Sequence, residues 1–409
     1  MIVKPSKACG KVMAPPSKSM AHRNLICAAL AEGDSVVKNI DLSQDIKATL
    51  ECITQLGAEA RIEGNTIYVK GSSDFTSIHQ RVFNCNESGS TLRFFIPLSM
   101  ISGEKCRFTG SEVLMTRPLS VYEKICSEQN ILLEHKNGGI EVEGKLKGGK
   151  FEVPGNISSQ FITGLLFTLP LLKEDSTIVL TESVESKPYI DMTLEVQKEF
   201  GIDAQWINEN TLKINGNQKY RNCVSTVEGD YSNAAFFEAL NTISGKVETE
   251  GLKKESLQGD KVYLPYFEAL KKDFCSLDIS DCPDLGPILF VVASLNHGAE
   301  FTGTRRLKIK ESNRGAVMCE ELAKFGVKTL QEENRIVIYK SEIHSPEEVI
   351  SGHNDHRIVM SFVTLLSVTG GKIEGVGAVK KSFPDYFKRI KKLGIDFEFE
   401  NQGESNGLV

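Results

Sequence analysis

The chain has 409 residues, which predicts two or three domains, because domains usually contain about 100–200 residues. Apolar residues make up 40% and charged residues 25% of the sequence, which argues against a disordered, collagen-like or coiled-coil chain. The formal net charge of −6 makes a nucleic-acid backbone an unfavourable main partner.

In chain order, the first informative element is a helix predicted to continue through Ala31. Ser17 or Ser19 could cap it, and Lys18 and Arg23 would lie in its first turns. A helix start offers unpaired N–H groups and a partial positive charge, so added Lys and Arg favour an anion there. Taken alone, however, an ordinary capped helix is the commoner meaning of such a segment.

Similar polar segments precede apolar helical stretches along the rest of the chain. They lie at residues 87–93, 115–118, 155–161, 186–189, 310–314, 354–357 and 381–385. Asp284 precedes an apolar helix or strand at 288–295, and Lys310 and Arg314 would share one face of a helix that runs to Phe325. Because these segments recur in an acidic chain, we expect them to converge on a polyanionic small substrate between two bodies.

The coarse organisation is a repeat of an amphipathic helix, a glycine and a polar two-strand segment. Clear copies lie at 51–71, 196–216 and 322–339, a fourth begins at 390–400, and blurred copies lie at 128–143 and 267–279. Six units of about 68 residues would account for the chain, which predicts an α/β or α+β fold. Because one core rarely exceeds ~250–300 residues, we expect two bodies of about three units each.

Several classes of site and location are disfavoured. The ten cysteines have no CxxC spacing, which predicts reduced and mostly buried thiols rather than disulfides or structural zinc. His353 and His356 have no third ligand cluster nearby, so we expect no metal. The longest apolar stretches fall far short of the ~20 residues that span a bilayer, and no secretory signal is visible. We therefore expect a cytoplasmic monomer with no nucleic-acid or membrane partner.

One set of motifs, taken in order, resembles a known family. The motifs are Lys18-Ser19 with Arg23, GNISSQF (155–161), SKPY (186–189), Lys310-Glu311 with Arg314, NDHR (354–357) and KSFPDYF (381–387). Together they resemble the 5-enolpyruvylshikimate-3-phosphate synthases over about residues 5–395. The resemblance implies a two-domain enolpyruvyl transferase fold, an inside-out α/β barrel with three βαβαββ-type units in each domain. Residues 20–227 would form the first domain and residues 1–19 with 228–409 the second, with the active site in the cleft between them.

The resemblance also implies the reaction. The enolpyruvyl group of phosphoenolpyruvate would move to the 5-hydroxyl of shikimate 3-phosphate, with release of phosphate, through a tetrahedral ketal and without a cofactor. Residues implied for shikimate 3-phosphate are Lys18, Ser19, Arg23, Ser158, Ser159, Gln160, Ser186, Tyr189, Asp284 and Lys310. Those implied for phosphoenolpyruvate are Lys18, Gly89, Arg117, Gln160, Arg314, Arg357 and Lys381. Both substrates are anions, so their approach requires neutralising cations.

The residues implied for catalysis are Asp284, Glu311, Lys18 and His356. Asp284 and Glu311 would supply the general acid and base, and their order of action stays open. Two positions differ from the family pattern: Glu87 stands where Asn is usual, and Asn313 where Asp is common. The Glu87 difference leaves the response to the inhibitor glyphosate open.

Two alternatives remain. The first is an enolpyruvyl transferase acting on UDP-N-acetylglucosamine, which shares the fold and the donor. That family has Lys-Asn rather than Lys18-Ser19, and a cysteine on a mobile loop, whereas this chain has none between Cys106 and Cys126. The second is a non-catalytic anion-binding module, which would have no need for Asp284 together with Glu311.

Overall fold

The structure is a computed structural model that describes residues 1–72 and 81–400. Its internal contacts divide the chain into two compact units, residues 16–228 and residues 1–15 together with those from 229 onward. The domain bounds predicted from the sequence put these two crossings at residues 19–20 and 227–228.

The unit of residues 16–228 alternates helices and strands. Its helices are α1 (Lys18–Leu30), α2 (Gln44–Gln55), α3 (Gly89–Ser99), α4 (Glu112–Met115), α5 (Ser120–Gln129), α6 (Ser159–Thr168) and α7 (Lys187–Glu199), with a 3-10 turn η1 (Leu169–Leu171). Its strands are β3 (Gly33–Lys38), β4 (Glu59–Glu63), β5 (Thr66–Gly71), β6 (Val82–Asn84), β7 (Cys106–Thr109), β8 (Leu132–Lys136), β9 (Gly139–Glu143), β10 (Lys150–Val153), β11 (Ser176–Leu180), β12 (Ala204–Asn208), β13 (Thr211–Ile214) and β14 (Val224–Thr226).

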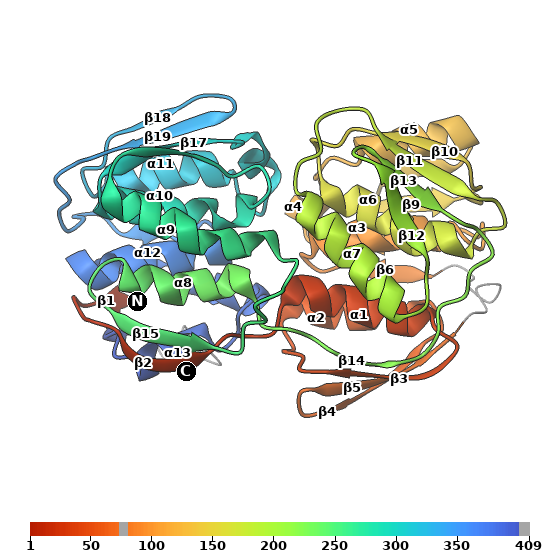
Figure 1. Ribbon diagram of the computed structural model, residues 1–409, viewed down its shortest axis with the longest axis horizontal. Helices are drawn as coiled ribbons and strands as arrows, with labels where there is room; N and C mark the ends of the chain where they lie inside the picture. Colours follow the sequence, from red (N-terminus) through yellow and green to blue (C-terminus); the bar gives the residue numbers. More distant parts are fainter. Residues whose placement is uncertain (73–80, 401–409) are drawn as a thin grey trace. The chain divides into compact units, whose positions relative to one another are not determined.

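These strands form three separate four-stranded sheets with one shared topology. The strand orders are β14-β3-β5-β4, β6-β7-β9-β8 and β10-β11-β13-β12. In each sheet the first pair is parallel and the next two pairs are antiparallel. Helices α1, α2, α3, α6 and α7 pack on one another, and the sheets cover them from outside, as Figure 1 shows. The apolar core of this unit therefore lies among its helices.

The other unit has the same kind of content. Its helices are α8 (Tyr231–Asn241), α9 (Tyr263–Lys272), α10 (Gly286–Leu295), α11 (Arg314–Ala323), α12 (His356–Thr369) and α13 (Tyr386–Lys392), with 3-10 turns η2 (Gly259–Val262), η3 (Pro283–Leu285), η4 (Arg305–Ile309) and η5 (Val376–Lys381). Its strands are β1 (Ile2–Val3), β2 (Cys9–Met13), β15 (Lys246–Glu250), β16 (Cys275–Asp278), β17 (Gly298–Thr302), β18 (Thr329–Gln331), β19 (Arg335–Tyr339), β20 (Ile350–Ser351), β21 (Gly371–Glu374) and β22 (Phe397–Glu398).

Two of its sheets repeat the four-stranded topology and one does not. The orders are β16-β17-β19-β18, β20-β21-β1-β22 and the parallel pair β15-β2. This explains the blurred copy at 267–279, because α9 is followed by the single strand β16, which pairs with β17 of the next sheet. In the copy at 390–400, β22 pairs with β1 from the other end of the chain. The expectation of a local two-strand segment is therefore wrong for these two copies.

The predicted fold class is confirmed as mixed α/β with repeated units. Gly57, Gly201, Gly326 and Gly394 follow their helices with φ between +78° and +99°, the left-handed conformation expected of them. The segment at 288–295, left open between helix and strand, lies in α10, which is buried on all sides. The described sheets are open four- and two-stranded sheets rather than a closed barrel. No helix within residues 1–72 and 81–400 is long and apolar enough to cross a membrane.

Candidate functional site

The first turn of α1 carries a paired lysine. Ser17 caps the helix, since its hydroxyl accepts from the backbone N–H of Met20 at 3.4 Å. Lys18 Nζ donates to Asp45 Oδ2 of α2 at 2.6 Å, and both side chains are less than one-fifth exposed. Sequence reasoning missed Asp45, whose only signal is its place in the first turn of α2. This carboxylate holds the Lys18 ammonium in one position.

Arg23, one turn further along α1, is buried among polar groups. Its guanidinium donates to the backbone oxygens of Ser19 and Tyr189 at 2.6 and 2.8 Å, and to Thr193 Oγ1 at 2.9 Å. Burial lowers its pKa to about 10, which leaves it charged at neutral pH. The contacts join α1 to α7, so three of the predicted residues, Ser19, Arg23 and Tyr189, lie together.

The start of α3 faces two guanidinium groups. Ser88 caps this helix, and Gly89 is its first residue. A Cβ on Gly89 would stand 2.6 Å from Arg117 Nη1 and 3.3 Å from Arg93 Nη1, so any side chain there would displace the Arg117 guanidinium. The Arg117 side chain has no hydrogen-bond or ion-pair partner among residues 1–72 and 81–400. Glu87, the departure from the family pattern, is half-buried and directly precedes the cap.

The start of α6 adjoins the same groups. Ser158 caps α6 and accepts from the backbone N–H of Gln160 at 3.3 Å. The Gln160 amide accepts from Arg93 at 2.6 Å and donates to Ser90 Oγ at 3.0 Å. Gln160 therefore joins α6 to α3, and Arg93, which sequence analysis did not assign to the site, belongs to this group. Ser159, the first residue of α6, is 5% exposed.

Ser186 precedes α7 in a strained conformation. Its φ of 57° is uncommon for serine, and the residue is buried. Such strain persists where the surrounding structure imposes it, and it often marks a functional position.

The described residues of the other unit hold a second group, centred on Asp284 in η3. Asp284 Oδ1 lies 3.0 Å from Lys310 Nζ and 2.8 Å from Arg314 Nη1, and its Oδ2 lies 3.4 Å from Arg357 Nη2. Burial raises the pKa of Asp284, but the charges of Lys310, Arg357 and Arg314 outweigh it and hold that pKa well below its usual range. Burial lowers the pKa of Lys310, and Asp284 opposes this change.

Arg314 pairs with three carboxylates in this group. Its Nε donates to Asp355 Oδ2 at 2.8 Å, and its Nη2 donates to Glu311 Oε2 at 2.6 Å, in addition to the Asp284 contact. Only 1% of its side chain is exposed. The three carboxylates outweigh burial and raise the pKa of Arg314. Any anion that binds Arg314 must therefore share it with these carboxylates.

The motif NDHR places Asp355, His356 and Arg357 at the start of α12. Asp355 is the N-cap and accepts from the backbone N–H of Arg357 at 2.9 Å. His356 is 2% exposed, with Nδ1 at 3.9 Å from Asp355 Oδ1. Lys381 Nζ donates to the backbone oxygen of Asn354 at 2.7 Å, so η5 is tied to the same turn.

The local structure around Lys310 corrects one expectation. Lys310 and Glu311 do not lie in a helical turn with Arg314, because α11 begins only at Arg314, after the cap Asn313. Lys310 is extended, with ψ of −161°, and reaches Asp284 from the end of η4. Lys381 ends η5, and the helix expected after the segment 381–385 is α13, which begins at Tyr386.

A buried carboxyl beside this group escaped sequence reasoning. Asp260 in η2 is 3% exposed, and burial followed by the charge of Asp284 raises its pKa to about 6. Arg357 and a hydrogen bond from Ser232 partly offset this shift. No local motif marks Asp260, so only the three-dimensional packing identifies it.

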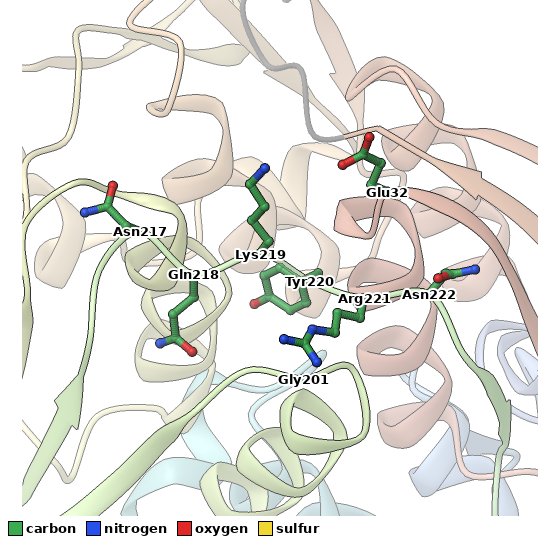
Figure 2. Close-up of a pocket in the computed structure, with 8 residues that line it drawn as sticks. All are labelled: Glu32, Gly201, Asn217, Gln218, Lys219, Tyr220, Arg221 and Asn222. Atoms are coloured by element: carbon green, nitrogen blue, oxygen red, sulfur yellow. The ribbon is translucent and has the colours of Figure 1, made fainter.

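Three surface pockets lie apart from the predicted residues. Figure 2 shows one of about 750 Å³, lined by Glu32, Gly201 and the segment 217–222. The Lys219 and Arg221 side chains extend in different directions there and do not converge on one point. The other two, of about 490 and 510 Å³, lie beside β4 and β5 and beside α4 and β9. None of the three contains a residue predicted to bind or react.

Comparison with known proteins identifies the family. A sequence profile described as EPSP synthase (3-phosphoshikimate 1-carboxyvinyltransferase) matches residues 2–390. The chain belongs to the EPSP synthase family. A 3-phosphoshikimate 1-carboxyvinyltransferase of Clostridium perfringens is 41% identical, with 96% of this chain and 98% of that protein covered. One of Clostridium beijerinckii is 42% identical, with 98% of both chains covered.

A solved structure agrees in fold. The EPSP synthase of Acinetobacter baumannii superposes with a TM-score of 0.78 at 21% identity, covering 97% of this chain and 98% of that one. The predicted membership of the EPSP synthase family is thus confirmed, and this family consists of transferases.

Proposed function

We propose that this chain transfers the enolpyruvyl group of phosphoenolpyruvate to the 5-hydroxyl of shikimate 3-phosphate and releases phosphate. Family membership over residues 2–390 carries the proposal. The chemistry of the candidate residues supports it. Arg117 lacks a partner among the described residues, and Lys18, Arg23, Lys310, Arg314, Arg357 and Lys381 are all substantially buried. Buried cations of this kind suit substrates that carry both phosphate and carboxylate groups.

The binding roles follow the positions of these groups. Ser158, Ser159 and Gln160 at the start of α6, with Ser19, Arg23, Ser186 and Tyr189, would bind shikimate 3-phosphate. Lys18, Gly89, Arg117 and Lys381 would bind the phosphate of phosphoenolpyruvate. Arg314 and Arg357 would bind its carboxylate, for which a planar guanidinium is suited. These assignments require residues of both units to act on the same pair of substrates.

The reaction needs one proton acceptor and one proton donor. In the addition step the 5-oxygen bonds to C2 of phosphoenolpyruvate, its proton leaves to a base, and an acid protonates C3. In the elimination step a proton leaves C3 and the C2–O bond to phosphate breaks. Asp284 and Glu311 would carry these protons, with Lys18 and His356 assisting. A substrate carboxylate on Arg314 and Arg357 would compete with Asp284 for their charge, which would raise the pKa of Asp284 toward a useful range.

Phosphate release tests the proposal directly. The chain should release phosphate from phosphoenolpyruvate when shikimate 3-phosphate is present. It should release no phosphate when UDP-N-acetylglucosamine replaces shikimate 3-phosphate, or when phosphoenolpyruvate is the only substrate. The acceptor product should gain the mass of an enolpyruvyl group. Phosphate release with UDP-N-acetylglucosamine would favour the enolpyruvyl transferase that acts on this sugar. If phosphate is released with neither acceptor, the chain would be a non-catalytic anion-binding module.

Removing the two serine hydroxyls at the start of α6 tests the acceptor site. The double variant Ser158→Ala with Ser159→Ala should raise the Kd of shikimate 3-phosphate by about 10²-fold, because hydrogen bonds to a charged phosphate are lost. Isothermal calorimetry measures this Kd. Ser111→Ala, which removes the N-cap of α4, controls for the loss of a cap. An unchanged Kd in the double variant would exclude this role.

A further inference from the structure

Four buried side chains that the proposed reaction does not use connect the second turns of α1 and α2 to the first turn of α3. His22 Nδ1 lies 2.7 Å from Thr49 Oγ1, and Thr49 Oγ1 lies 2.8 Å from Thr91 Oγ1. The Thr91 hydroxyl donates to Ser88 Oγ at 2.7 Å. Each of the four side chains is at most 1% exposed. We call these four residues the hydroxyl row.

The hydrogen bonds of the row fix the state of His22. Because the Thr91 proton points to Ser88, the Thr49 proton must point to Thr91, and His22 Nδ1 must donate to Thr49. His22 then carries a proton on Nδ1. Its Nε2 is buried with no hydrogen-bond partner among residues 1–72 and 81–400, so a proton there would be costly. Burial, with the charges of Lys18 and Arg23, also holds the pKa of His22 well below its usual range.

The hydroxyl row lies next to the residues assigned to the phosphate of phosphoenolpyruvate. Lys18 is four residues before His22 on α1, and Asp45, which holds Lys18, is four residues before Thr49 on α2. Residues four apart share a helix face. Ser88 directly precedes Gly89, whose backbone approaches Arg117. A shift in the row would therefore change the spacing between the Lys18 ammonium and the start of α3.

We propose that Thr49 is a positioning residue for the phosphate of phosphoenolpyruvate, acting with His22 and Thr91 to fix Lys18 relative to Gly89. This inference rests on the proposed function. Thr49 occupies the centre of the row and is the one member that contacts both other helices. A displacement of about 1 Å in a binding group can reduce activity by ~10²-fold, so the row acts on binding through Lys18 and Gly89 without touching substrate.

The same unit offers a matched control. Thr193 on α7 accepts from Arg23 Nε at 2.9 Å and lies 3.1 Å from Thr163 Oγ1. Thr193 and Thr49 are both fully buried within helices. Valine has the shape of threonine but lacks the hydroxyl, so Thr49→Val and Thr193→Val should disturb stability similarly. They should differ in which substrate they affect, because Arg23 is assigned to shikimate 3-phosphate.

The experiment compares two constants for each variant. Thr49→Val should raise the KM of phosphoenolpyruvate about tenfold and leave the Kd of shikimate 3-phosphate within about twofold. Thr193→Val should show the opposite pattern, and Thr49→Ser should restore the KM. The fluorescence of Trp206, the only tryptophan and in the same unit, checks that each variant is folded. Equal effects of Thr49→Val on both substrates, or no effect, would overturn the inference.

A second measurement needs no turnover and separates this inference from the proposed function. Nitrogen-15 NMR of the histidine rings, with His22 assigned through His22→Gln, should show a neutral ring protonated on Nδ1 even at about pH 5.5, where an ordinary histidine is charged. A charged ring, or a proton on Nε2, would overturn the inference even in an active enzyme. A wild-type chain that releases no phosphate, yet shows this tautomer, would refute the proposed function instead.

Discussion

Replacing Asp284 with Asn should lower kcat by about 10²–10⁴-fold, the usual contribution of a general acid or base. The amide of Asn keeps the shape of the Asp284 side chain but cannot act as a general acid or base. It also removes a negative charge from Lys310, Arg314 and Arg357, so anionic substrates should bind at least as tightly as before. Steady-state phosphate release gives kcat and KM, and calorimetry gives the Kd of shikimate 3-phosphate.

Glu311→Gln should show a similar fall in kcat, because it removes the second proposed proton carrier. Glu268→Gln is the control, since Glu268 is exposed on α9 and pairs only with Lys271 among the described residues. The control should retain wild-type kcat. Near-normal turnover in both Asp284→Asn and Glu311→Gln would refute the assignment of these carboxylates, whereas weakened binding without a change in kcat would make them binding groups only.

Arg314→Met should lower the free energy of unfolding by about 3–5 kcal/mol, the usual cost of removing one partner from a buried ion pair. Asp355 is fully buried and would lose its guanidinium partner, and Asp284 and Glu311 would each lose one contact. Equilibrium urea unfolding followed by circular dichroism measures the change. Lys11→Met is the control, because Lys11 is 64% exposed and its pairs with Glu248 and Glu250 lie at the surface. The control should cause no measurable loss.

The stability difference caused by Arg314→Met should shrink at low pH. Burial opposes the charge of Asp355, but Arg314 outweighs it and lowers the pKa of Asp355 below 3.8 in the folded chain. Such a group stabilises the fold above the unfolded pKa, and this contribution is lost as pH falls through the folded value. Wild type should therefore lose its advantage over the variant below about pH 4. A difference that is small at neutral pH, or one that is independent of pH, would contradict the buried pairing.

The fold was largely predictable because its repeats leave local signals. Gly57, Gly201, Gly326 and Gly394 mark helix ends through a backbone conformation that other residues rarely adopt, and the helix caps Ser17, Ser88 and Asp355 have short polar side chains that suit their positions. The errors occur where pairing is non-local. No local pattern shows that β16 joins the sheet of β17 or that β1 completes the sheet of β21 and β22.

The candidate site was predictable only in part. Lys18, Arg314 and Arg357 belong to recognisable motifs, and their roles stay predictions until substrates are bound. Asp45 and Asp260 carry no motif, since a single acidic residue near a helix start is most often an ordinary surface group. Their importance arises from burial beside specific charges, which depends on how distant segments pack. The hydroxyl row escaped for the same reason, because threonines inside helices are common in any core.

Strand β1 has a consequence for synthesis. Residues 2 and 3 lie between β21 and β22, so their hydrogen-bonding partners are translated about 370 to 400 residues later. During translation, every residue of the unit 16–228 is synthesised before the sheet of β1, β21 and β22 can form. Residues 2 and 3 therefore lack these partners through most of translation, and the assembly of this sheet is a late event.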